Sequence, residues 1–181
     1  MSIMVVIFVI LAAIALALVL FRTAHGAAAK VDSIDDLQGF TEPIDLPAFL
    51  NLVDPAEEEF LRARLTPLMF RKVQRQRLLA AAEYVRCAAK NAALVVRLGE
   101  AASAEASTEI SGIGQELVTA AIRLRALAVL ALCLLYVKTA IPNARISLFQ
   151  FPNLYEHLIE RVGHLARLKS PAQAGRVLQA L

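Results

Sequence analysis

Three side chains that can bind a metal lie close together near the C-terminus: His157, Glu160 and His164. Offsets of three and seven residues place all three on one face of a helix. Two imidazoles and a carboxylate are ligands that zinc and other transition metals accept. However, the order is neither the HExxH of zinc proteases nor the paired Glu-x-x-His of di-iron bundles, and a metal site needs further ligands. We therefore interpret them as polar residues on an exposed or juxtamembrane face and expect no metal and no cofactor.

Other signatures of catalysis do not occur in the sequence. No GxSxG, P-loop or GxGxxG motif is present. Cys87 and Cys133 lie in helical sequence rich in alanine and leucine, without a CxxC pair, and we expect them to be small buried hydrophobes. The sequence therefore predicts a protein that is not an enzyme, with an unrecognised metal-dependent enzyme as the weakest alternative.

A cluster of basic side chains carries the clearest binding chemistry. The heptapeptide RKVQRQR, within the basic helix predicted over 62–77, contains Arg71, Lys72, Arg75 and Arg77. Such a surface attracts anionic lipid headgroups or the phosphates of nucleic acid. The cluster has no interleaved aromatic residues for base stacking and no nucleic-acid motif, so anionic lipid is the preferred partner.

The charges are segregated along the chain, which leaves two interpretations open. Residues 32–60 carry nine acids and no base, whereas residues 61–100 carry nine bases against two acids. Such blocks can steer a charged partner, or they can face each other within one fold.

The N-terminus predicts a membrane anchor. Ile3 to Phe21 are nineteen consecutive apolar residues without a charge, glycine or proline. As a helix this segment is about 28 Å long, close to the thickness of a bilayer's hydrocarbon core. A cleaved signal peptide is the alternative, but the segment before the apolar run has no Lys or Arg and the run is longer than usual. Arg22 and Lys30 follow the span, which favours a cytoplasmic C-terminal domain.

Helix start signals divide the remainder of the chain. Asp45 precedes Pro47, Asp54 precedes Pro55 and Thr66 precedes Pro67, each a cap followed by proline in the first turn; the last pair either starts a new helix or kinks the previous one. Apolar residues spaced by threes and fours predict a long helix over 67–102, and a second over 115–141. A turn over 103–114 connects them, which predicts an antiparallel hairpin.

The second long helix contains the most apolar sequence outside the anchor. Residues 126–137 are apolar on every side, which predicts burial all round, although the run is too short to span a membrane. A membrane-entering helix over 117–141 is the alternative. Because a chain of this size has few helices to cover the run, we expect Leu130, Leu134 and Leu135 to contact another subunit or lipid.

The segment ARISLFQF over 144–151 is the best strand candidate, followed by a helix from Pro152 to about Lys169 and a last helix beginning at Pro171. The predicted fold is all-α: a single transmembrane helix over 1–22, an acidic juxtamembrane linker over 23–46, and a domain over 47–181 with four to five helices built on the hairpin. The predicted function is a noncatalytic subunit or scaffold of a membrane-associated assembly, with other subunits or a second copy as partners. The first alternative is a module that binds anionic lipid or nucleic acid through residues 62–77.

Overall fold

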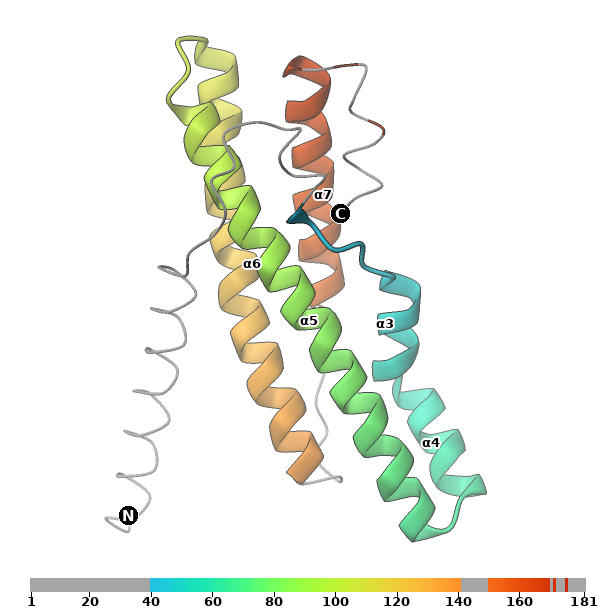
Figure 1. The fold of residues 1–181 in the computed structure, drawn as a ribbon. Helices are drawn as coiled ribbons and strands as arrows, with labels where there is room; N and C mark the ends of the chain where they lie inside the picture. The colour runs from blue at the N-terminus through green and yellow to red at the C-terminus, as the bar shows by residue number, and fades with distance from the viewer. Residues whose placement is uncertain (1–39, 141–149, 170, 172–174, 176–181) are drawn as a thin grey trace, which may run out of the picture.

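The computed structural model describes residues 40–140, 150–169, 171 and 175, and within this part of the chain it contains helices and no strand (Figure 1). Two short helices are followed by two long ones and a fifth of intermediate length. They are α3 (Leu46–Val53), α4 (Pro55–Arg64), α5 (Pro67–Ser103), α6 (Thr108–Ala140) and α7 (Gln150–Lys169). The all-helical class predicted from the sequence is confirmed for these residues.

The three predicted start signals each begin a helix. The Asp45 carboxylate accepts a hydrogen bond from the Ala48 amide at 2.9 Å, and the Asp54 carboxylate accepts one from the Ala56 amide at 3.0 Å. Each of these bonds satisfies an amide that has no partner within its helix. Thr66 makes no such side-chain bond, and the backbone is extended at Leu65 and Thr66. The pair Thr66-Pro67 therefore starts a new helix rather than kinking the previous one.

Helices α5 and α6 form the predicted antiparallel hairpin and are the longest elements of the bundle (Figure 1). The turn between them covers only residues 104–107, so the predicted turn over 103–114 was too long. Gly112 and Gly114 suggested a turn, yet both lie inside α6 and neither has a positive φ. Gly114 allows the two helices to pack closely. The missing Cβ that suits glycine to turns also suits it to such a close backbone contact.

The hairpin is tightest next to this turn. A Cβ on Gly114 would lie 2.6 Å from the Ser103 amide nitrogen and 2.7 Å from the Gly99 carbonyl oxygen. A Cβ on Gly99 would lie 2.9 Å from the Gly114 carbonyl oxygen. The hydroxyl of Ser111 donates to the Ser103 carbonyl oxygen at 2.9 Å and so joins the two helices at the same place. The two backbones approach this closely only because neither glycine carries a side chain.

The core extends from this contact along the hairpin and beneath α7. Helices α5 and α6 contribute buried alanines and leucines, and the fully buried aromatic side chains come from α3 and α7. Phe49 of α3 and Phe151 and Tyr155 of α7 are at most 2% exposed, and the rings of Phe49 and Phe151 lie 5.5 Å apart. Helices α3 and α7 therefore cover the hairpin with aromatic side chains.

The strand prediction for 144–151 is wrong where it can be examined. Gln150 and Phe151 form the first turn of α7, and the remaining residues of that segment lie outside the described part. Pro152 does not interrupt the helix. It is the third residue of α7, where a backbone amide would have no hydrogen-bond partner within the helix, so the amide hydrogen that proline lacks is not needed. Burial of Phe151 against Phe49 favours the helix over an isolated strand. The anchor between Ile3 and Phe21 also lies outside the described residues, as does the last predicted helix apart from Pro171 and Gly175.

Among the described helices, one is long and apolar enough to cross a membrane by length and composition. It is α6, and 33% of its most apolar window is buried within the bundle. The other residues of that window are half-buried or exposed, so the predicted all-round burial of residues 126–137 is not what the bundle provides.

Two glycines of α6 provide a matched test of the close approach. Gly114→Ala should destabilise the fold by about 1–3 kcal/mol, because its methyl group meets backbone atoms that cannot move independently. Gly112→Ala meets nothing within 4 Å and should stabilise the fold by about 0.5–1 kcal/mol through helix propensity. Denaturant unfolding of the full chain followed by circular dichroism measures both. Equal effects from the two substitutions would contradict the close packing.

Candidate functional site

The histidine face predicted on α7 is solvent-exposed. His157 Nδ1 lies 3.4 Å from Glu160 Oε2, and the two side chains are 72% and 75% exposed. His164 is also exposed on the same helix. Across residues 40–140 and 150–169, no three His, Cys, Asp or Glu side chains come together as a set able to hold a metal. The interpretation of these three residues as an exposed polar face agrees with their positions.

The basic cluster is divided by the fold. Arg71, Lys72 and Arg75 are exposed, and none forms an ion pair with another described residue. Arg77 lies inward with a side chain only 12% exposed; its Nη2 donates to the Asn51 carbonyl oxygen at 2.7 Å, and Glu57 lies 3.9 Å from its Nη1. Two residues along a helix rotate a side chain by about 200°, which separates Arg77 from Arg75. Only three of the four predicted residues therefore present a basic surface.

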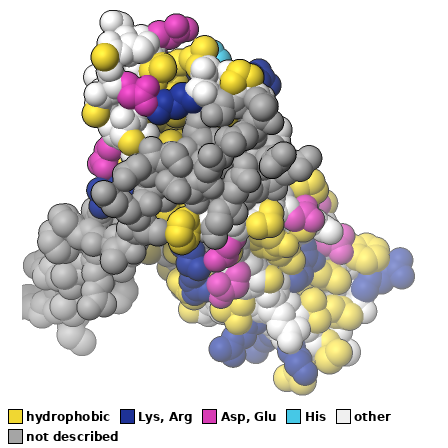
Figure 2. All heavy atoms as spheres, turned by 45° about the horizontal axis from the view of Figure 1, so that its top comes forward, with side chains coloured by type: hydrophobic (Ala, Val, Ile, Leu, Met, Phe, Trp, Pro, Cys, Tyr) yellow, Lys and Arg dark blue, Asp and Glu magenta, His cyan; other side chains and the backbone are white. Residues whose placement is uncertain are grey.

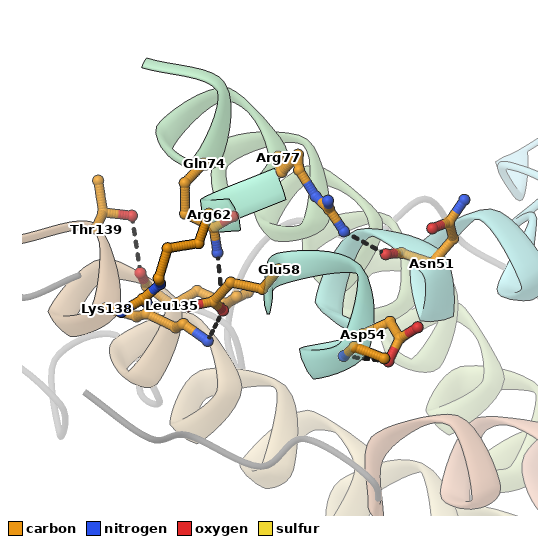
Figure 3. A network of polar contacts seen from close by, with 10 residues as sticks. Asn51, Asp54, Glu58, Arg62, Gln74, Arg77, Leu135, Lys138 and Thr139 are labelled. Carbon is orange, nitrogen blue, oxygen red and sulfur yellow. Dashed lines mark hydrogen bonds and ion pairs between the residues drawn. The ribbon is translucent and has the colours of Figure 1, made fainter. Parts of the chain in front are cut away.

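A polar network holds the end of the bundle next to this surface (Figure 3). Glu58 of α4 accepts from Arg62 at 2.9 Å, from the Gln74 amide of α5 at 3.1 Å and from Lys138 of α6 at 2.6 Å. The side chains of Glu58 and Lys138 are 13% and 11% exposed, so solvent screens this pair only weakly. Glu58 thereby ties three helices together, and acids of the 32–60 block do pair with bases elsewhere in the fold.

A hollow of about 620 Å³ opens beside this network, between the start of α5 and the end of α6. Three arginines provide its charge, and the remaining lining is largely apolar. The Arg62 guanidinium also lies 5.0 Å from the centre of the Phe70 ring. The lining residues are Arg62, Leu65, Pro67, Phe70, Arg71, Arg75, Thr139 and Ala140. An amphipathic hollow of this kind can hold an anionic group attached to an apolar body.

Large hydrophobic side chains are exposed around the connection between α4 and α5, next to this hollow. Leu68 is 79% exposed, Phe60 53% and Met69 50%. The Arg64 guanidinium lies 5.3 Å from the centre of the Phe60 ring. We call these residues, together with Arg71, Lys72 and Arg75, the basic tip. The sequence indicated its charge but not its apolar component.

A second exposed surface runs along the outer face of α6. Ile122, Leu130 and Val137 are 53%, 53% and 48% exposed, and Ala126 and Cys133 lie exposed between them. Steps of four, four, three and four residues align these five side chains in one stripe. We call it the α6 stripe. Of the three leucines predicted to contact a partner, Leu130 lies in the stripe, Leu134 is half-buried, and Leu135 is 1% exposed in the chain's own core.

A buried polar site at the centre of the bundle escaped the sequence analysis. Asn91 of α5 is fully buried; its Oδ1 accepts from the Glu42 amide at 3.0 Å and its Nδ2 donates to the Glu42 carbonyl oxygen at 2.7 Å. The same Nδ2 donates to the Tyr155 hydroxyl of α7 at 3.1 Å. Asn91 therefore fixes the segment before α3 onto α5 and α7. One asparagine in a long helix gives no signal of its own in the sequence.

The Glu42 side chain extends this site to the surface. Its carboxylate accepts from the Cys87 thiol at 2.9 Å and from the Lys90 ammonium at 3.0 Å, and these hydrogen bonds lower the pKa of Glu42. Burial, together with the adjacent Glu42 carboxylate, raises the pKa of Cys87 to about 11. The Cys87 thiol is therefore protonated at neutral pH and is a poor nucleophile.

Comparison with protein-family models, with curated proteins and with solved structures finds no match for this chain. The basic tip and the α6 stripe are therefore the surfaces whose residues indicate a function.

Tyr155 provides a pH-dependent test of the buried polar site. Burial raises the pKa of Tyr155 to about 12, so its contribution to stability is complete below the unfolded pKa near 10 and is lost as pH rises through 12. At pH 12 the loss should be about 2 kcal/mol relative to pH 9. Tyr155→Phe should lack this loss in alkaline unfolding experiments.

Phenolate absorbance gives the same test directly. The last of the chain's three tyrosines should titrate near pH 12, and this step should disappear in Tyr155→Phe. Tyr136→Phe, which removes a tyrosine that is 42% exposed, should leave it in place. If no phenolate step appears near pH 12 while the chain is folded, Tyr155 is not buried as described.

Proposed function

We propose that this protein is a membrane-anchored, noncatalytic helical subunit or scaffold of a membrane-associated assembly, and that the α6 stripe is its protein-binding surface. The observation that carries the proposal is the exposure of Ile122, Leu130 and Val137 on one helix face. An aligned apolar surface in contact with water is unfavourable, and burial against a partner recovers roughly 25 cal/mol per Å². Other subunits or a second copy of the chain are the expected partners.

The stripe suits a protein partner better than a position within the bilayer. Helix α6 packs along α5, so a membrane-crossing α6 would take α5 into the bilayer with it. Helix α5 carries Arg86, Lys90 and Arg97 along its middle and end, all at least partly exposed. Each such base near mid-membrane costs about 2.5–3.5 kcal/mol on insertion scales. The length and composition of α6 alone would allow it to cross a membrane, but the bases on α5, which packs against it, make insertion of the pair unfavourable.

The membrane component of the proposal rests on the apolar run from Ile3 to Phe21. Its length matches the hydrocarbon thickness, and it has no charge that would oppose insertion. Arg22 and Lys30 favour a cytoplasmic side for everything that follows. The alternative of a metal-dependent enzyme has less support, because His157 and Glu160 are largely exposed and further ligands are not gathered around them in residues 40–140 and 150–169.

Leu130→Asp should weaken assembly without unfolding the chain. The side chain is 53% exposed, so the carboxylate remains solvated in the isolated subunit but would be buried in a complex. We expect at least about tenfold weaker association, the usual effect of losing one buried leucine. Leu79→Asp on α5, at a leucine that is 40% exposed outside the stripe, is the matched control.

Gentle detergent extraction followed by light scattering and identification of co-purifying chains measures this association. Equal loss of assembly with Leu130→Asp and Leu79→Asp would argue against a specific role for the stripe. A wild-type chain that remains a monomer with no co-purifying protein would refute the proposal.

Membrane orientation can be tested with reporters fused to the C-terminus. A reporter active only in the cytoplasm should be functional, and one active only outside the cytoplasm should be silent, because Arg22 and Lys30 are retained on the inner side. Arg22→Gln combined with Lys30→Gln should reduce this bias. Activity of the external reporter on the wild-type chain would reverse the proposed topology.

A further inference from the structure

We infer that the basic tip is a binding site for anionic phospholipid, in which the exposed apolar side chains enter the bilayer surface and the adjacent arginine-lined hollow receives the phosphate headgroup. The site would hold one end of the helical bundle against the membrane. It is separate from the α6 stripe, but it rests on the proposed function in one respect, because the expected anchor keeps the tip near a bilayer.

Large apolar side chains are exposed at the end of the bundle. Leu68, at 79%, is the most exposed of the large hydrophobic residues described. Phe60 before the turn between α4 and α5 is 53% exposed, and Met69 after it is 50% exposed. The turn is held by Pro67 and by the Glu58 network, so these residues are not available to the core. They have an apolar environment only if something outside the bundle provides it.

The charge of the basic tip complements an anionic surface. Arg64, Arg71, Lys72 and Arg75 are exposed beside these side chains, and Figure 2 shows Lys and Arg side chains next to hydrophobic ones around the lower end of the molecule. Glu59 is the exposed acid nearby in sequence, whereas Glu57 and Glu58 are directed to Arg77 and Lys138. Each base near an anionic membrane strengthens the attraction by about fivefold.

The hollow beside the tip suits a phosphate headgroup. It is open beside the tip, its volume of about 620 Å³ exceeds that of a phosphate group, and Arg62, Arg71 and Arg75 line it. Arginine binds phosphate through paired N–H donors, and the guanidinium groups of Arg71 and Arg75 have no ion pair with a described residue. Leu65, Pro67 and Phe70 form apolar walls in which the glycerol and upper acyl carbons can pack.

The combination favours a lipid over a nucleic acid. A phosphate backbone would neutralise the bases but would leave Leu68 and Met69 in water, whereas a bilayer surface satisfies both components. Phe60 is the one exposed aromatic of the tip, and the Arg64 guanidinium already lies over its ring. Successive base stacking, which single-stranded nucleic acids use, has no platform here.

The test uses an introduced tryptophan, because the chain contains none. Leu68→Trp in the full chain is placed in nanodiscs of phosphatidylcholine, with or without phosphatidylglycerol. With phosphatidylglycerol we expect emission to move to shorter wavelength and brominated lipid tails to quench it. Ala106→Trp, an exposed position at the opposite end of the hairpin, should show neither effect.

A matched pair of charge variants separates the site from general electrostatics. Adding Arg71→Gln and Arg75→Gln to the Leu68→Trp chain should shift the docking equilibrium about thirtyfold toward the undocked state, as expected for two bases. Arg123→Gln with Arg167→Gln removes the same charge at exposed positions outside the tip and should have little effect. If the two double substitutions weaken docking equally, the inference of a specific site at the tip is wrong.

The remaining outcomes are also decisive. If Leu68→Trp enters the nanodiscs but its emission is the same with and without phosphatidylglycerol, the inference fails while the anchor stands. If the chain does not enter nanodiscs, the anchor fails, and the inference then requires the same shift when phosphatidylglycerol vesicles are added to the soluble chain. A shift caused by an oligonucleotide but not by these vesicles would assign the tip to nucleic acid instead.

Discussion

The close approach of α5 and α6 is the constraint on which the rest of this structure depends. Gly99 and Gly114 bring the two backbones together beside a short turn, and alanines continue the contact along the hairpin. Leucines such as Leu98, Leu117 and Leu124 add volume to the hairpin's side of the core, but the hairpin contributes no fully buried aromatic side chain. The aromatic side chains of α3 and α7 complete the core against the hairpin, so the position of the hairpin decides where these helices must pack.

Two polar sites then fix the shorter elements to this frame. Glu58 joins α4 to both long helices, and Asn91 holds the backbone of Glu42 and the Tyr155 hydroxyl. Both sites are largely removed from solvent, where an unpaired polar group is costly, so they specify one arrangement more strongly than apolar packing would. The Glu58 network also holds the basic tip in a fixed position, which couples the packing of α4 to the surface that we assign to lipid.

The two exposed surfaces follow from the same geometry. A helix packed against a partner on one side can bury only part of its circumference, and α6 is apolar over more than that part. The excess appears as the α6 stripe. At the end of the bundle, the break at Leu65 and Thr66 leaves the first turn of α5 without a covering helix, so Leu68 and Met69 remain in water. For the membrane-anchored subunit that we propose, a neighbouring subunit and the bilayer surface are the two partners that such surfaces would contact.

The sequence by itself determined the helical class, the starts of α3, α4 and α5, and the pairing of the two long helices, because caps, prolines and apolar periodicity act within a few residues. It also located the basic cluster and the excess apolar character of residues 126–137. It misread Gly114 as part of a turn, because a glycine required for close packing and a glycine required for a bend look the same along the chain.

Only the tertiary structure decided which way each of these side chains faces and what it meets. Arg77 turns inward while Arg71 and Arg75 remain exposed, Leu135 joins the core while Leu130 does not, and Phe151 packs into a helix rather than a strand. Asn91 acquires its role only when Glu42 and Tyr155, distant in sequence, are brought to it. These outcomes depend on contacts between elements, and the free energy of such contacts is not encoded in the pattern of any one segment.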